Sequence, residues 1–501
     1  MLKFLIAIIP IVWLILALCV IKMPGWKACG IAAVLAAVLA MVCFNMQPLH
    51  ALSAVLEGTL NALWPICMVI ISALFVYNLT RKTGAMETIK NMLSGVSSDK
   101  LVILLIIGWG FGNFMEGMAG FGTAVAIPAG ILVAMGYDPI RTVIACLVVN
   151  STPTAFGSVG VPTTTMAAVT GLDALAISKN IVIIQFILTL IAPFMMVMIA
   201  EGSPKVLRRM WPFCLLASLS FILPQFAAAA WIGPELPNII GSVVSMLCMI
   251  LAALRMEKKK NPAASALGSI TPNEALQAWS PFLLIFVILL LTSSLLPALH
   301  TPIASISTKV KVYLGEKPGT LTFAWLDCPG VKIILAGLIG GRIQKASWKT
   351  IFSVLMQTLK DNVKTIFTIC SVLAVAKIMG YSGMISAIAA LLVSLTGNYY
   401  PLISPLIGMI GGFVTGSGTS TAVLFGSLQT QTASAISVSP EWLAAANMMG
   451  GGIGKMISPQ GIAIGCAASG LSGKESTILS KTMIYAILYI LVGGIVCMIG
   501  A

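Results

Sequence analysis

The chain has 501 residues, of which 58% are hydrophobic and only 9% charged, and its mean hydropathy is +1.03. Soluble domains carry about 25% charged residues, so this composition excludes an ordinary soluble protein and indicates one embedded in a lipid bilayer. The net charge of +14 could suggest a nucleic-acid partner. However, the basic residues fall between apolar runs, where membrane topology explains them better, and we expect no nucleic acid.

Apolar runs of the length that crosses hydrocarbon recur along the whole chain. A membrane-spanning helix needs roughly 20 apolar residues, and several runs approach or reach this length. No alternating strand pattern competes with them, so helices are the only spanning option. The clearest runs cover residues 4–21, 28–44, 101–109, 181–200, 281–296 and 483–498. We therefore expect an all-α polytopic membrane protein.

Basic residues alternate between the loops that join these runs. Lys82 lies in a basic loop and Lys258 in a basic linker, whereas residues 45–54 contain neither Lys nor Arg. Cytoplasmic loops carry an excess of Lys and Arg, so this pattern places Lys82 and Lys258 in the cytoplasm and both chain termini outside. The polar insert from His300 to Pro329 is then external, and its Gly, Pro and Thr content predicts a loop.

Two halves of the chain share an unusual polar pattern. Thr-Ala-Val triplets begin at Thr123 and Thr421, 298 residues apart, and each is followed by a segment that starts with Asn and ends with Pro twelve residues later. The loop charges make equivalent spans near residues 63–77 and 363–378 run in opposite directions. The sequence therefore predicts an inverted-topology repeat, the arrangement that places a transporter's site at the midplane.

This repeat divides the chain into four parts. Residues 1–54 form two N-terminal transmembrane helices, and residues 55–200 form the first inverted repeat. Residues 201–354 hold three central spans with a cytoplasmic linker and the external insert. Residues 355–501 form the second inverted repeat.

Helix-weakening residues lie at matching places in the two repeats. Each Gly weakens a helix by about 1 kcal/mol relative to Ala, and irregular backbone at membrane depth is tolerated where it lines a cavity. We expect Gly117–Thr123 and Thr415–Thr421 to be tips of re-entrant hairpins. We expect residues 150–162 and 447–459 to be breaks in discontinuous helices. The alternative is that these small residues only let helices pack closely.

The predicted tips and breaks would present free backbone N–H groups and positive dipole ends to an anion. Hydroxyl and amide side chains would add donors, and one lysine would add a charge. The candidate substrate-binding residues are Gly120, Thr123, Asn150, Ser151, Thr152, Thr415, Ser417, Thr419, Ser420, Thr421, Asn447, Lys455, Ser458 and Gln460.

Two ionisable residues, Glu116 and Lys455, fall inside these polar runs. A charge at the bilayer centre costs about 2.5 to 3.5 kcal/mol even on a lenient scale, so both should face a cavity or a partner. Glu116 is the candidate proton-coupling group, and the alternative is a structural ion pair with Lys455. Lys377 is expected to snorkel from a helix end. Eleven cysteines without CxxC spacing indicate no disulfide framework, and we expect no metal and no cofactor.

Five segments together resemble the signatures of the L-lactate permease family. They are Glu116–Thr123, Asn150–Gly157, Trp231–Pro237, Leu424–Gln429 and Gly454–Gln460. The resemblance covers nearly the whole chain and implies a bacterial inner-membrane symporter that takes up lactate, and often glycolate, with protons. Where the family commonly has Thr-Gly-Ser-Asp-Thr-Ser-Ser-Asn, this chain has Gly418 for the Asp and Ala422 for the Asn. A candidate acidic coupling group is therefore missing, which leaves Glu116 as the best proton carrier.

Other functions need features that this sequence lacks. A membrane-embedded enzyme would need clustered His, Cys, Asp or Glu at membrane depth, and the predicted core offers only Glu116 and Lys455. A channel could use polar rings, but broken helices in both halves suit a gated, alternately exposed site better. The sequence leaves open whether the substrate is L-lactate, D-lactate, glycolate or a broader organic anion. The sequence also leaves open whether the coupling ion is H⁺ or Na⁺, and whether the protein is a monomer or a homodimer.

Overall fold

The computed structural model describes residues 2–17, 21, 23–120, 122–260, 271–293, 295–316, 320–471 and 474–501. Almost all of this part is helical, with one two-stranded sheet. By length and apolar composition, nine of the described helices could cross a membrane, or up to eleven spans form if two bent helix pairs count as one each. The prediction of an all-α polytopic membrane protein is confirmed.

The N-terminal helices lead into the first repeat. They are α1 (Leu2–Ala7), α2 (Ile9–Ile15), α3 (Gly25–Cys43) and α4 (Pro48–Asn61). The first repeat then contains η2 (Ala62–Cys67), α5 (Met68–Lys82), α6 (Ala85–Ser94), α7 (Lys100–Leu104), η3 (Leu105–Phe111), α8 (Gly112–Met118), α9 (Thr123–Ala134), α10 (Pro139–Val149), η4 (Pro153–Phe156), α11 (Gly157–Thr170), α12 (Ala174–Ile184) and α13 (Phe186–Glu201).

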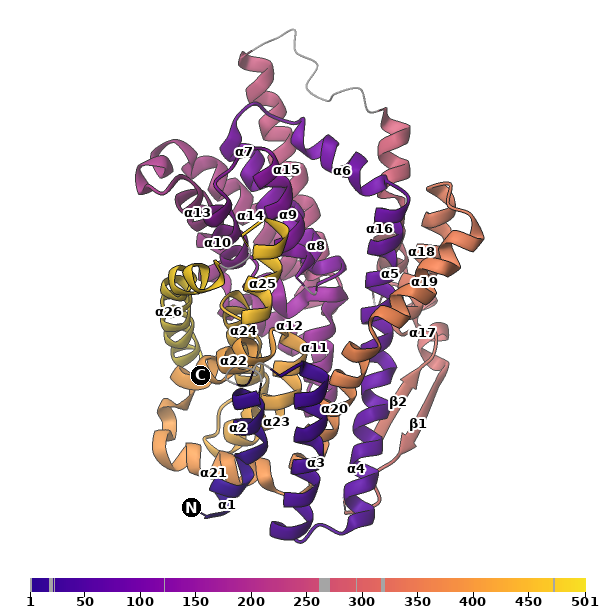
Figure 1. Cartoon of the computed structure of the whole chain (residues 1–501), viewed down its shortest axis with the longest axis vertical. Helices are drawn as coiled ribbons and strands as arrows, with labels where there is room; N and C mark the ends of the chain where they lie inside the picture. Colours follow the sequence, from indigo (N-terminus) through magenta and orange to yellow (C-terminus); the bar gives the residue numbers. More distant parts are fainter. Residues whose placement is uncertain are drawn as a thin grey trace.

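The second repeat follows the same order of elements. It contains α20 (Val363–Tyr381), α21 (Met384–Thr396), η6 (Gly397–Tyr399), α22 (Tyr400–Thr415), α23 (Gly418–Ala435), α24 (Pro440–Met456), α25 (Pro459–Ala468) and α26 (Glu475–Ile499). Gly84 and Gly383 start α6 and α21 with φ of 79° and 83°, so even the turn geometry is repeated. In Figure 1, α6 lies near the top and α21 near the bottom, because α5 and α20 run in opposite directions. The repeat is therefore inverted.

Each repeat contains a hairpin that enters the molecule and turns back. We call residues 100–134 (α7 to α9) hairpin 1 and residues 400–435 (α22 and α23) hairpin 2. The second arm of hairpin 1, α9, has 12 residues. At 1.5 Å per residue such an arm is about 18 Å long, well short of a hydrocarbon core of roughly 30 Å. The re-entrant hairpins predicted from the glycine runs are confirmed.

The central segment links the repeats and contains the one sheet of the described residues. Its elements are η5 (Pro204–Val206), α14 (Leu207–Trp231), α15 (Pro237–Lys260), α16 (Pro272–Leu291), α17 (Pro297–Ser305), β1 (Ser307–Lys311), β2 (Thr320–Ala324), α18 (Pro329–Ile343) and α19 (Trp348–Asp361). The prediction that the insert is a loop was wrong, because it folds as α17 and an antiparallel β1–β2 pair. β-branched Thr and Val side chains favour these strands, and Trp64 Nε1 anchors them by donating to Ala324 O at 3.2 Å.

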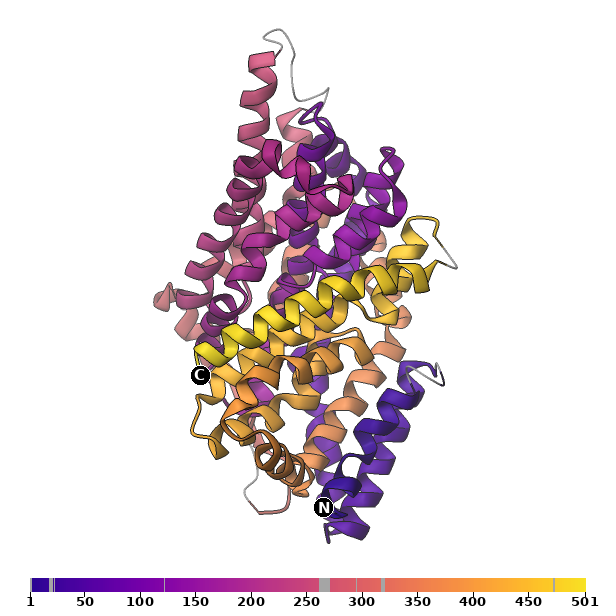
Figure 2. The same cartoon turned by 90° about the vertical axis from the view of Figure 1, so that its left-hand side faces the viewer.

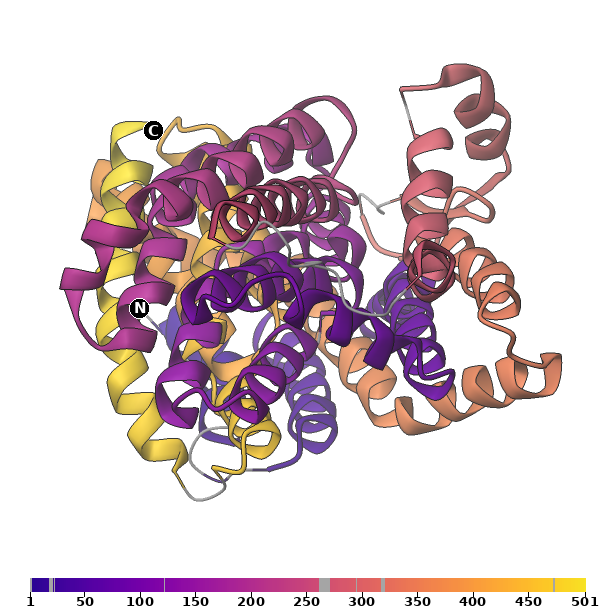
Figure 3. The same ribbon diagram turned by 90° about the horizontal axis from the view of Figure 1, so that it is seen from above.

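The helices form two groups that are seen side by side from above (Figure 3). Helices α5, α16, α18 and α19 pack together in the smaller group. The larger group contains both hairpins and the broken helices, with α26 crossing obliquely over its outer face (Figure 2). Helix α20 packs against α3, α4 and α23. The linker end of α15 and helix α6 lie at one end of the molecule and the N-terminus at the other (Figure 1). Which end faces the cytoplasm stays a prediction.

Candidate functional site

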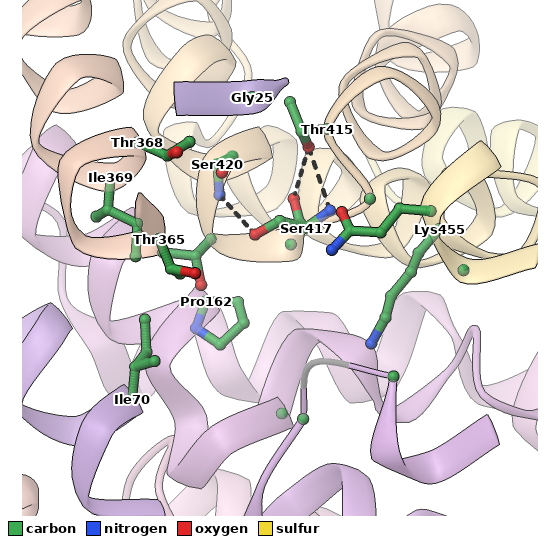
Figure 4. Close-up of a pocket in the computed structure, with 18 of the residues that line it drawn as sticks. Gly25, Ile70, Pro162, Thr365, Thr368, Ile369, Thr415, Ser417, Ser420 and Lys455 are labelled. Atoms are coloured by element: carbon green, nitrogen blue, oxygen red, sulfur yellow. Dashed lines mark hydrogen bonds between the residues drawn. The ribbon is translucent and has the colours of Figure 1, made fainter. Parts of the chain in front are cut away.

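A cavity of about 480 Å³ lies where the hairpin tips and helix breaks of both repeats meet. Its walls come from α3, α20, both hairpin tips, the start of α11 and the α24–α25 junction. Figure 4 shows Lys455 extending into this cavity, with Thr365 and Thr368 of α20 on another wall and the Ser417 turn between them. Polar backbone from both repeats is therefore gathered at one place, as the inverted repeat predicts.

The tip of hairpin 1 is a turn that only glycine fits. Gly120 and Gly122 have φ of 60° and 84°, and a Cβ at Gly120 would collide with Ser158 Oγ. Ser158 Oγ donates to Ala119 O at 2.8 Å, and Thr123 Oγ1 donates to Gly120 O at 2.7 Å. These bonds hold the tip against the break in α11, so the two irregular segments of the first repeat form one unit.

The tip of hairpin 2 presents a helix N-terminus to the cavity. Gly416 turns the chain with φ of 64°, and Ser417 caps α23 by accepting from Ser420 N at 3.2 Å. Thr415 Oγ1 accepts from Ser417 N at 3.2 Å (Figure 4). Thr419 and Ser420 in the first turn line the cavity. The free N–H groups and the positive dipole end of α23 therefore suit an anion.

The first helix break agrees with the predicted segment. Between α10 and α11 the axis bends by 63°, and Ser158, Val159 and Gly160 all have positive φ. Non-glycine residues rarely adopt this conformation, so the backbone here is held in place by its surroundings. One such contact is close, because a Cβ at Gly157 would lie 2.5 Å from Glu116 Oε1.

The second break is shorter than the sequence predicts. Asn447 and the glycines of 450–454 lie inside α24, and the chain breaks only at Ile457 and Ser458. These glycines stay helical because α24 packs backbone to backbone on α22; a Cβ at Gly450 would collide with Pro405 O. The alternative interpretation, close helix packing, therefore holds for this run. Ser458 caps α25 by accepting from Gly461 N at 3.1 Å.

Glu116 and Lys455 form an ion pair that joins the two repeats across the cavity. Lys455 Nζ lies 2.6 Å from Glu116 Oε1, and the two side chains are 10% and 2% exposed. Glu116 Oε2 has no hydrogen-bond partner among the described residues. The carboxylate is therefore only half satisfied, which is costly for a buried charge.

About half of the predicted binding residues line the cavity. Those that do are Gly120, Thr415, Ser417, Thr419, Ser420, Lys455 and Gln460, together with Glu116. The others do not line it: Thr123, Asn150, Ser151, Thr152, Thr421, Asn447 and Ser458. Most of these hold the irregular backbone: Ser151 Oγ donates to Val148 O at 2.7 Å and Thr421 Oγ1 to Ser417 O at 2.8 Å. Asn447 Oδ1 accepts from Gln429 at 3.2 Å in a network between helices.

Sequence reasoning missed two walls of the cavity: the start of α3, with Gly25, Trp26 and Cys29, and one face of α20. Lys364, Thr365, Thr368 and Ile369 of α20 line the cavity. Their spacing of three and four residues puts them on one helix face, a signal that could have found them. Lys364 adds a second ammonium to the cavity.

The expectation that Lys377 snorkels was wrong. Lys377 Nζ lies 2.7 Å from Glu57 Oε1 in a second buried ion pair, outside the cavity. Glu57 lies in α4 and is 2% exposed. Its carboxylate also accepts from Tyr381 OH at 2.9 and 3.1 Å. The inference that only Glu116 and Lys455 are ionisable in the core was therefore wrong too.

Gly418 faces the first repeat. A Cβ at this position would lie 3.2 Å from Thr154 Cγ2 and 3.3 Å from Pro162 Cβ. An acid here would thus sit between hairpin 2 and the break of α11. Among the described residues, no three His, Cys, Asp or Glu side chains gather as metal ligands would.

The chain is similar to known permeases over most of its length. The chain is 43% identical over 445 residues to an L-lactate permease of Streptococcus iniae, covering 89% of this chain and 94% of that one. It is 33% identical over 539 residues to the glycolate permease GlcA of Escherichia coli K12, covering 100% and 96%. A solved structure, MtrF of Neisseria gonorrhoeae, is similar with 15% identity and a TM-score of 0.47, covering 89% and 83%. The L-lactate permease family profile matches residues 3–501, so the chain belongs to this family.

Proposed function

We propose that this protein is a secondary active transporter that takes up L-lactate, or a similar short 2-hydroxy monocarboxylate such as glycolate, together with a proton across a bacterial inner membrane. The Glu116–Lys455 pair in a cavity between two inverted repeats is the observation that carries the proposal. The names of the relatives, L-lactate permease and glycolate permease, support the substrate class.

The cavity offers a small carboxylate what it needs. Lys455 and Lys364 supply positive charge, and the first turn of α23 supplies free N–H groups. Hydroxyls of Ser417 and Thr419 add partners for a 2-hydroxy group. A cavity of about 480 Å³ holds such a substrate with accompanying water.

Proton coupling follows from competition for Lys455. A substrate carboxylate that approaches the Lys455 ammonium weakens its bond to Glu116. Glu116 is then a buried carboxylate with one oxygen already unpartnered, and taking up a proton removes this cost. One anion and one proton are thereby bound together, so the loaded cavity gains no net charge.

Alternating access would use the inverted architecture. Hairpin 1 and hairpin 2 approach the cavity from opposite ends of the molecule, so each can close one side. The pair between Glu116 in hairpin 1 and Lys455 in α24 holds the two repeats together without substrate. Loosening this pair by substrate and proton would free the repeats to move.

Purified protein in proteoliposomes tests the proposal. We expect an inward pH gradient to drive uphill accumulation of labelled L-lactate, and counterflow to accept L-lactate and glycolate with substrate recovered unchanged. Accumulation driven by a Na⁺ gradient alone would show that the coupling ion is Na⁺ and not a proton. Failure of both substrates in counterflow would contradict the substrate class.

A further inference from the structure

A second cavity, of about 130 Å³, lies away from the first, where the α14–α15 connection meets the insert. Four ionisable side chains line it: Glu235 from the connection, His300 from α17, and Asp327 and Lys332 around the start of α18. Two acids, one lysine and one histidine thus share a small space. Glu235 belongs to the Trp231–Pro237 segment, to which the proposed transport mechanism assigns no role.

The charges in this cavity are unevenly paired. Lys332 Nζ lies 2.7 Å from Asp327 Oδ1, and His300 Nδ1 lies 3.7 Å from the same oxygen. Asp327 is therefore paired with Lys332, while His300 Nδ1 lies closer to Thr292 O, at 3.0 Å. Among the described residues, no basic nitrogen lies within 4.0 Å of the Glu235 carboxylate. A proton is the simplest way to neutralise this second acid.

The surroundings of the Glu235 carboxyl also favour its protonated form. Burial raises the pKa of the Glu235 carboxyl above its usual range, and the nearby Asp327 charge adds to this rise. The backbone amide of Glu235, Lys332 and His300 oppose it without cancelling it. As the pH falls, Glu235 therefore takes up a proton before an ordinary exposed glutamate would.

The Glu235 connection also touches the main site. Gly160, in the positive-φ stretch of α11, lies so close to Pro234 that a Cβ would collide with Pro234 O. Asn238 Nδ2, three residues after Glu235, donates to Asn113 O of hairpin 1 at 2.8 Å. A change at Glu235 can therefore reach both segments that position Glu116, through the backbone approach of Pro234 to Gly160 and the side-chain hydrogen bond of Asn238 to hairpin 1.

We propose that this second cavity is a proton-binding site of the transporter, in which Glu235 takes the proton and the state of Glu235 sets the position of hairpin 1 and the α11 break. The proposal rests on the proposed transport function, but it adds a site distinct from the Glu116–Lys455 pair. Lys332 and His300 oppose protonation of Glu235, whereas the Asp327 charge favours it.

The test uses [¹⁴C]L-lactate exchange in proteoliposomes with equal pH on both sides, measured over a series of pH values. Glu235→Gln mimics the protonated acid, so we expect its exchange at alkaline pH to match that of the wild type at acidic pH. Where the Glu235→Gln variant keeps a pH dependence that comes from other groups, we expect the midpoint of its exchange profile to differ from the wild-type midpoint by at least about one unit. Glu316→Gln, an exposed acid of the same insert, is the matched control and should keep the wild-type profile.

A Glu235→Gln profile that superimposes on the wild-type profile overturns the proposal. If that variant does not fold, Lys332→Gln takes its place: it removes a positive charge that lowers the pKa of Glu235, so the midpoint should move to higher pH, and an unmoved midpoint overturns the proposal equally. Because no gradient is imposed, the result stands even if Na⁺ drives accumulation and proton symport fails.

Discussion

Among the described residues, two Glu–Lys pairs have a buried carboxylate and almost the same distance but different surroundings. Glu116–Lys455 and Glu57–Lys377 are separated by 2.6 and 2.7 Å, and both carboxylates are 2% exposed. The single Tyr381 hydroxyl hydrogen is shared between the two oxygens of Glu57, so Oε2 of this carboxylate has a donor within reach, whereas Glu116 Oε2 has no partner among the described residues. The first pair lines the cavity at an irregular backbone, and the second lies between two regular helices.

We propose that this difference separates an ion pair that takes part in transport from one that only stabilises the fold. A saturated pair stabilises one arrangement of its helices, because any movement leaves a buried charge uncompensated. An unsaturated pair beside a cavity can exchange a partner for a ligand or a proton at lower cost. The Lys–Glu distance and the burial of the carboxylate do not distinguish the two pairs. The pairs differ in whether the second oxygen of the carboxylate still lacks a hydrogen-bond partner.

Replacing Lys455 by Met should have the largest effect on function. The substrate would lose its ammonium partner and Glu116 the lysine with which it is paired, so we expect L-lactate affinity to fall at least about 1000-fold, or roughly 4 kcal/mol. Calorimetric titration of the purified variant measures this. Lys474→Met, a lysine outside the cavity, is the control. Unchanged affinity would make the Glu116–Lys455 pair purely structural.

Replacing Glu57 by Gln should lower stability and leave the transport mechanism intact. The variant loses a charge-assisted bond and leaves Lys377 without its carboxylate, so we expect a loss of about 1.5 to 3 kcal/mol and a lower Tm in detergent. Per folded molecule, the affinity for L-lactate and the pH-driven accumulation should match the wild type. Glu87→Gln, in an exposed pair with Lys90, should change neither Tm nor transport. A Glu57→Gln protein that is stable but uncoupled would remove the distinction between the two pairs.

Replacing Lys364 by Gln should have a smaller effect, because this lysine is exposed at the rim of the cavity and is screened by water. We expect the apparent KM for L-lactate to rise by about three- to tenfold with little change in maximal rate, and Lys364→Arg to restore it. Lys360→Gln, in the last turn of α19 and outside the cavity, controls for general surface charge. An equal rise in KM for both Gln variants would show that only net charge matters.

The sequence predicted the repeat better than the contacts inside it. Glycine runs and the spacing of Thr123 and Thr421 revealed the hairpins, because backbone conformation is encoded locally. The second break was placed too broadly because a glycine run reads the same whether it breaks a helix or lets α24 approach α22. Glu57 was missed because it lies near the end of a span, and only the folded chain brings Lys377 and Tyr381, from a helix about 320 residues away, to its carboxylate. The α20 wall was missed because its polar residues are spaced three and four apart along an otherwise apolar helix and do not form a continuous polar run.

Glu116→Gln tests the central claim most directly, by comparing L-lactate exchange between equal pools with accumulation under an inward pH gradient in the same proteoliposomes. Gln keeps the size of the protonated acid but cannot release a proton, so we expect exchange to continue and pH-driven accumulation to be lost. A Glu116→Gln protein that still concentrates L-lactate under the pH gradient would contradict the assignment of Glu116 as the proton-coupling residue.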